Sequence, residues 1–148
     1  MPDQQHLLPD GDRKKTIQEL EGEDWGEGDF FPSYLVKTCH ALRRKPLCDF
    51  TVEDLRIMIG QNIGLPYLMP LAIKQLQRDP LASGDFYEGD LLISVLRAET
   101  RFWQEHPDLH VAVQHLVATM PSFPENTFSG IIKDFEKALA RFNAVTFQ

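Results

Sequence analysis

The chain has 148 residues, of which 43% are hydrophobic and 25% charged, and its formal net charge is −7. A domain of this size buries enough surface to fold without a metal or a disulfide. The acidic balance disfavours direct binding of nucleic acids, because phosphate backbones are held by clustered lysines and arginines. It favours a basic partner, since complementary charge raises the association rate, although a charge of this size also simply keeps a small protein in solution.

The cysteines and the N-terminus indicate a cytoplasmic protein. Cys39 and Cys48 have neither the spacing of a zinc site nor that of a CxxC redox pair. Residues 1–15 lack the apolar core of a signal peptide, and no segment has the roughly 20 apolar residues of a membrane span. We therefore expect reduced thiols and no membrane association.

Residues 1–15 predict a flexible N-terminal tail, and residues 16–148 predict a single helical domain. Thr16 and Glu19 match a capping box, and Gly22 must end the helix that they start. Residues 21–30 form the most acidic segment of the chain, and their glycines predict a loop, the first acidic loop, which also carries Trp25 and Phe30. Its carboxylates lack the spacing of a calcium-binding EF-hand.

A helix from Ser33, its N-cap, to about Lys45 comes next. Leu35, Cys39 and Leu42 recur at helical spacing, so they predict an apolar stripe that faces the core.

The centre of the chain predicts two buried helices that meet at a tight bend. Residues 57–73 contain no charged side chain, and Gly60 and Gly64 bracket the bend. Thr51 is a good N-cap for the first of these helices. Pro66 suits the opening turn of the second, whereas Pro70 predicts a kink or a later helix start.

The second half of the chain predicts further short helices with breaks between them. Asp79-Pro80 ends the second central helix, and another acidic, glycine-containing loop follows over residues 81–90. A helix is expected directly after this loop. Thr100 is the expected cap of the next helix, and Pro107 opens another.

Residues 121–148 form the expected C-terminal helical extension, with a helix from about Thr127 to Asn143. Its apolar face has the clearest helical period in the chain and consists of Phe128, Ile131, Ile132, Phe135, Leu139 and Phe142. We expect this face to dock across the bundle, with docking on a second copy of the chain as the alternative. Because no segment alternates strictly between apolar and polar residues, we predict an all-α fold, an irregular bundle of about six or seven short helices.

The sequence predicts no catalytic site, no metal site and no cofactor. Cys39 and His40 are neighbours on a helix, so their side chains point about 100° apart and do not face each other. His106 precedes a proline at a helix start, and His110 and His115 lie about 140° apart around a helix. None of these pairs matches a nucleophile with its base or a zinc ligand set.

Two long segments carry a family resemblance. Residues 51–65 read TVEDLRIMIGQNIGL and residues 79–92 read DPLASGDFYEGDLL. Together with the flanking chain from Thr16 to about Leu109, they resemble the immunity proteins of bacterial contact-dependent growth inhibition systems, the CdiI proteins. The resemblance implies an antitoxin of the cytoplasm, without enzymatic activity. Such a protein binds and neutralises the C-terminal toxin domain of a cognate effector and so protects the producing cell.

The implied partner is a toxin domain, expected to be a basic nuclease, and the free protein is expected to be monomeric. Tight blocking concentrates binding energy in a few aromatic anchors ringed by polar groups. We therefore expect the toxin-binding residues in the two acidic loops, namely Glu23, Asp24, Trp25, Glu27, Asp29, Asp85, Tyr87, Glu88 and Asp90. A helical adaptor or dimerising scaffold is the alternative function, and a hydrolase that uses Glu53, Asp54 or a histidine is a third.

Overall fold

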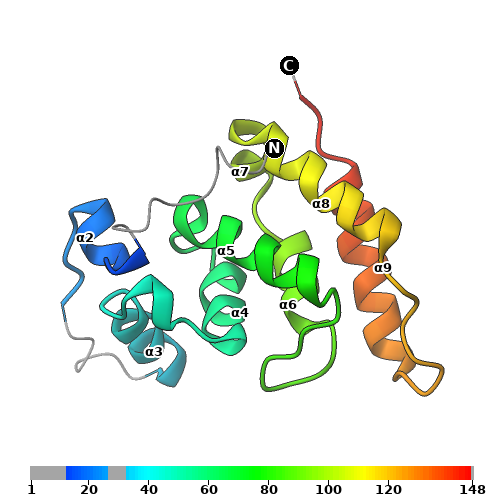
Figure 1. Cartoon of the computed structure of the whole chain (residues 1–148), viewed down its shortest axis with the longest axis horizontal. Helices are drawn as coiled ribbons and strands as arrows, with labels where there is room; N and C mark the ends of the chain where they lie inside the picture. The colour runs from blue at the N-terminus through cyan, green and yellow to red at the C-terminus, as the bar shows by residue number, and fades with distance from the viewer. Residues whose placement is uncertain (1–12, 27–32, 148) are drawn as a thin grey trace.

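The computed structural model describes residues 13–26 and 33–147. Within these ranges the chain forms eight α-helices and one short 3-10 helix, and its strand-like pairing is limited to an isolated bridge between Ser83 and Glu88. This confirms the all-α class, with one helix more than the expected range. The elements are α2 (Ile17–Glu21), α3 (Tyr34–Leu42), η2 (Leu47–Asp49), α4 (Val52–Gly60), α5 (Leu65–Arg78), α6 (Asp90–Leu96), α7 (Thr100–Glu105), α8 (Pro107–Thr119) and α9 (Ser129–Asn143) (Figure 1).

Helices α4, α5 and α6 form the centre of the molecule, with α2 and α3 on one side, α8 and α9 on the other, and α7 above the centre in Figure 1. Helix α4 packs against α3, α5 and α6, while α9 packs against α6 and α8 against α5. Met58, Leu68, Leu92 and Trp103 are fully buried where these layers meet. Most apolar residues of the uncharged central segment are therefore buried, as its composition predicts, whereas Gly60, Gln61 and Asn62 at the bend are exposed.

The predicted helix starts at Thr16, Ser33 and Thr51 are confirmed by side-chain caps. The Thr16 hydroxyl accepts the Glu19 N–H at 3.1 Å, and the Thr51 hydroxyl accepts the Asp54 N–H at the same distance. Thr100 does not cap α7, because Glu99 is the N-cap and Thr100 is the first helical residue. The sequence alone does not show whether a threonine hydroxyl bonds to the helix, so a helix start that is predicted from one threonine is uncertain by about one residue.

The bend between α4 and α5 contains Gly60 as the last residue of α4 and Gly64 as the N-cap of α5. Gly64 has φ 65°, a left-handed conformation that glycine adopts without strain. The expected late start at Pro70 is wrong, because α5 runs unbroken from Leu65 through Pro70. Burial of the Pro70 ring in the core offsets the backbone hydrogen bond that proline cannot donate.

The amphipathic face of α9 packs inside the chain. Phe142 is buried and stacks on the His110 ring with 4.0 Å between centroids, and His110 Nε2 lies 2.9 Å from the Phe142 carbonyl oxygen. Phe135 and Leu139 also pack against the core. Phe128 departs from the prediction, since it is the N-cap of α9 and 73% exposed.

No helix in the described ranges is long and apolar enough to cross a membrane.

Candidate functional site

The loop between α5 and α6 is organised by one buried carboxylate. Asp90 is 3% exposed, and its oxygens accept the N–H groups of Gly84 at 2.6 Å and Phe86 at 3.1 Å. The N–H of Tyr87 also points to this carboxylate, at 3.4 Å. Asp90 was expected on the toxin-facing surface, but it lies beneath the surface and holds the loop instead. A charged acceptor satisfies buried N–H groups well, which explains an aspartate at this position.

Helix α4 also holds the α5–α6 loop in place, through Glu53. Glu53 accepts the Asp85 N–H at 3.0 Å and forms two bonds with Arg56, at 2.5 and 2.7 Å. The Arg56 guanidinium lies 4.2 Å from the centroid of the Phe86 ring. Phe86 is thus held on the cation while 70% of it remains exposed.

A groove of about 690 Å³ runs between α3, α4 and this loop. Its edges carry Tyr34, which is 83% exposed, and Phe86. Carboxylates of Glu53, Asp54 and Asp85 lie along it. Sequence reasoning missed the groove, because its walls come from three separate segments, although Phe86 belongs to the predicted loop.

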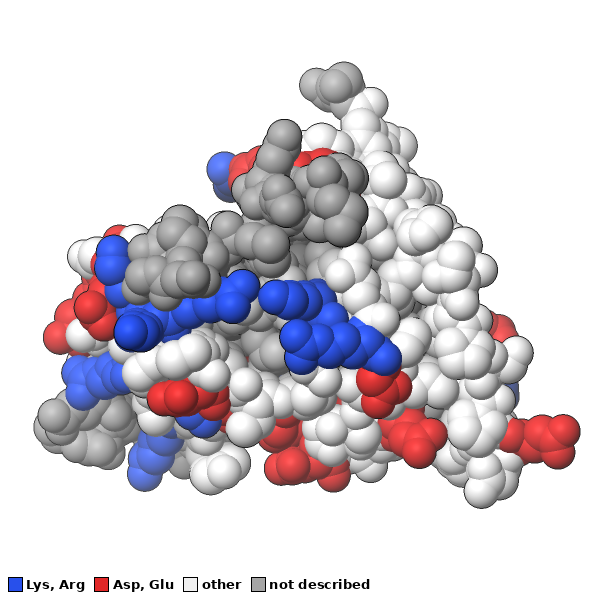
Figure 2. Space-filling model, in the orientation of Figure 1, with Lys and Arg blue, Asp and Glu red and all other residues white. Residues whose placement is uncertain are grey.

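The apolar floor of the groove includes Leu35 and Ile57. Leu35 was expected in the core, but 39% of it is exposed because it borders this groove. In the view of Figure 2, many acidic side chains lie along the lower edge, where the α5–α6 loop lies in Figure 1, and lysines and arginines cross the middle.

The first acidic loop is anchored by Arg43, which is 1% exposed. Its guanidinium pairs with Glu21, donates to the Glu23 carbonyl oxygen at 2.6 Å and lies 4.0 Å from the centroid of the Trp25 ring. Trp25 is 39% exposed, so one part of its ring packs on Arg43 while another reaches the surface. The loop therefore presents Trp25 from a fixed position.

Asp24 is also held in place. It accepts the Gly26 N–H at 2.7 Å and pairs with Arg44 at 3.3 Å. The Gly26 N–H and the Arg44 guanidinium lower the pKa of this carboxyl group.

The remaining expected contact residues differ in position. Glu23, Asp85 and Glu88 are exposed, and Tyr87 is half-buried against the core, where burial raises the pKa of its phenol. Glu27 and Asp29 lie outside the described residues.

Cys39, His106 and His110, candidate catalytic or metal-binding residues by their type, are engaged in packing, whereas His115 is exposed. Cys39 is buried, and this burial raises the pKa of its thiol. His106 and His110 lie at hydrogen-bonding distance from backbone carbonyls, those of Phe102 and Phe142. Among residues 13–26 and 33–147, no three histidines, cysteines or acids are grouped to hold a metal ion.

Two comparisons bear on the identity of the chain. A search of curated proteins finds no match. The family model of CDI immunity proteins matches residues 19–113, which include the groove and both acidic loops. This match confirms the resemblance and covers well over half of the sequence. The chain therefore belongs to the CDI immunity proteins, a family whose members neutralise toxins.

Proposed function

We propose that this protein binds the C-terminal toxin domain of its cognate effector in the cytoplasm of the producing cell. Binding alone blocks the toxin, without a chemical step by the immunity protein. Family membership supports this proposal, and so does the groove between α3, α4 and the α5–α6 loop.

The observation that carries the proposal is the pair of exposed aromatic rings at the groove. Tyr34 and Phe86 are 83% and 70% exposed and line the same groove, and exposed aromatic side chains that are grouped in this way mark interaction sites. Carboxylates of Glu53 and Asp85 flank them. An aromatic centre with a polar rim is the usual composition of an energetic hot spot in an interface.

The order of the loop supports tight binding as well. Asp90 and Glu53 hold the backbone of Gly84, Asp85 and Phe86 before any partner arrives. A surface that is already ordered loses less conformational entropy on association, so more of the contact energy appears as affinity.

The groove lining carries three carboxylates, those of Glu53, Asp54 and Asp85, against the one guanidinium of Arg56, so it favours a basic toxin surface. A nuclease with a cationic substrate site is the partner that we propose. Glu23, Asp24 and Trp25 of the first acidic loop are proposed to extend the contact. Opposite charges on the two proteins raise the association rate at low salt, and screening weakens this effect as salt rises.

Calorimetric titration of the purified protein with the toxin domain encoded immediately upstream tests the proposal. We expect a one-to-one complex with a dissociation constant of about 1 nM or below, because one free toxin molecule is harmful. The affinity should fall as the salt concentration rises. Absence of a complex with this toxin contradicts the proposal.

A further inference from the structure

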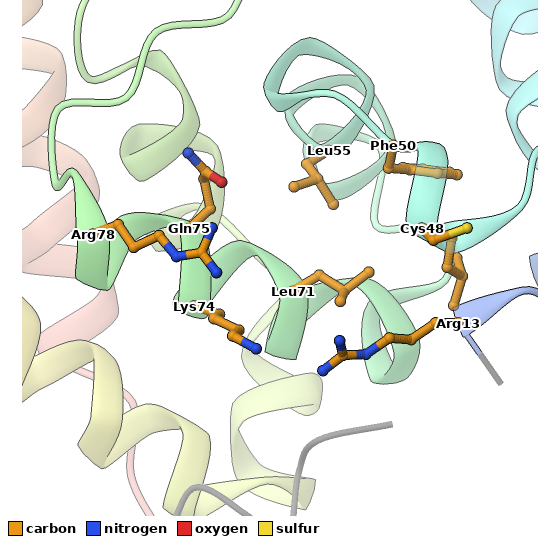
Figure 3. A pocket seen from close by; sticks show the side chains of 9 residues that line it. Arg13, Cys48, Phe50, Leu55, Leu71, Lys74, Gln75 and Arg78 are labelled. Carbon is orange, nitrogen blue, oxygen red and sulfur yellow. The ribbon is translucent and has the colours of Figure 1, made fainter. Parts of the chain in front are cut away.

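A second cavity lies on the other side of α4, apart from the groove. It has a volume of about 260 Å³ and is bounded by η2, α4, α5 and the segment before α2. Its lining shares no residue with that of the groove. Arg13, Lys74 and Arg78 supply its charge (Figure 3), and cations cross the same face in Figure 2.

The three cations line one cavity although they repel one another. In Figure 3 the Arg13 side chain extends along α5 toward Lys74, and Arg78 extends from the next turn of α5. Lys74 and Arg78 are four residues apart on one helix, where like charges destabilise. The chain has 22 acidic residues. Nevertheless, none in the described ranges forms an ion pair with any of the three.

Arg13 adds a second, independent sign of a ligand. Its Nε atom is buried and has no hydrogen-bond acceptor among the described residues. A buried donor without a partner lowers stability, and a bound anion would supply the missing acceptor. Guanidinium groups hold phosphate through paired N–H donors, and a lysine ammonium adds a point charge.

The wall behind the cations is apolar. Phe50, directly after η2, Leu55 of α4 and Leu71 of α5 line the cavity. At about 260 Å³ the cavity is just below the roughly 300–1,000 Å³ of sites for drug-sized molecules, and it is much smaller than the groove. Its size therefore favours a small ligand over a segment of another protein.

We propose that this cavity binds a small phosphate monoester with a planar apolar group. Its phosphate lies among Arg13, Lys74 and Arg78, and its planar group packs against Phe50 and Leu71. This site is independent of the toxin-binding groove, so the protein is able to hold a small phosphorylated ligand on one face and the toxin on another.

Cys48 provides a direct readout, since its exposed thiol lines this cavity whereas Cys39 is buried. Phenyl phosphate is the probe, and the alkylation rate of Cys48 is followed by mass spectrometry at constant ionic strength. We expect phenyl phosphate to slow alkylation at least roughly threefold, with half-protection at about 1 mM or below. Phenol, which lacks the phosphate, should leave the rate unchanged.

In the double variant Lys74→Gln/Arg78→Gln, the phenyl phosphate concentration that gives half-protection should rise at least roughly tenfold. Lys133→Gln/Lys137→Gln is the matched control, because it removes two exposed cations four residues apart from α9. In the control variant, phenyl phosphate should protect Cys48 as it does in the wild type. Circular dichroism of both variants verifies that they are folded.

Three results overturn this proposal. The first is the absence of protection by phenyl phosphate up to about 10 mM in the wild type. The second is equal protection in the wild type and the α5 double variant. The third is protection by an acidic peptide such as oligoglutamate but not by phenyl phosphate, which would assign the cavity to carboxylates of a protein.

Discussion

Glu53 on α4 accepts the backbone N–H of Asp85 at 3.0 Å, although the two residues are 32 positions apart in the sequence. The same carboxylate is held by Arg56, whose guanidinium lies against Phe86. The position of the α5–α6 loop therefore depends on α4, and the shape of the groove depends on both. The predictions below separate residues that hold this surface from residues that form its contacts.

Asp90→Asn tests the buried carboxylate of the loop. The change removes the charge that accepts N–H groups from Gly84 and Phe86, so the free energy of unfolding should fall by about 2 kcal/mol in urea denaturation. Glu88→Gln changes an exposed acid in the same loop and should stay within about 0.5 kcal/mol of the wild type. Equal effects of the two changes would show that Asp90 is not the organising residue.

Arg43→Met tests the anchor of the first acidic loop. The variant loses the contacts with Glu21, the Glu23 carbonyl oxygen and the Trp25 ring, and stability should fall by about 2–3 kcal/mol. Acrylamide should quench the fluorescence of the variant more strongly, since Trp25 becomes free while Trp103 stays buried.

Arg44→Gln is the control for this anchor, because Arg44 is the neighbouring, exposed arginine. It should change stability by less than about 0.5 kcal/mol. Unchanged quenching in Arg43→Met would contradict the role of Arg43.

The fold was largely predictable because its signals are local. A threonine hydroxyl three residues before an acid, as at Thr51, determines a helix start through contacts within one turn. The glycines at the bend and the uncharged segment that contains them act over similarly short distances. Leu35 and Phe128 were wrongly predicted to be buried. Helical spacing places a residue on one face of a helix, but its burial depends on whether another segment packs over that face.

The candidate site was only partly predictable. Composition identifies an acidic loop with an aromatic residue, and the structure indeed exposes Asp85 in such a loop. Composition does not distinguish Asp90, which is buried, from its exposed neighbours. It also does not predict that Tyr34 and Phe86 line one groove, since that depends on how α3 packs against α4.

The ion pair of Glu53 predicts a pH dependence of stability. Hydrogen bonding to Arg56 lowers the pKa of Glu53 below its ordinary value of 4.5. A depressed folded-state pKa contributes stability that is fully present above the unfolded-state pKa and is lost as pH falls through the folded value. The Glu53→Gln variant should therefore be less stable than the wild type at pH 7, and the difference should shrink below about pH 4.5.

Urea denaturation across this pH range measures the difference, with Glu88→Gln as the exposed control. If the difference in the free energy of unfolding between the wild type and Glu53→Gln stays constant from neutral to acidic pH, the pH dependence does not come from Glu53.

The two cysteines should differ in reactivity. Cys48 is exposed and should react with iodoacetamide in the native protein, whereas Cys39 is buried with a raised pKa and should react only in urea. Mass spectrometry should find one modified site in the native wild type and none in native Cys48→Ser. Rapid modification of Cys39 in the native protein would mean that α3 opens readily.

The most direct test of the account compares toxin binding by Phe86→Ala and Phe128→Ala. Both phenylalanines are similarly exposed, at 70% and 73%, but only Phe86 lines the groove. Calorimetry with the upstream toxin domain should show affinity reduced about 30-fold, or about 2 kcal/mol, for Phe86→Ala and unchanged for Phe128→Ala. Wild-type affinity in Phe86→Ala, or an equal loss in both variants, would contradict the assignment of the groove as the toxin-binding surface.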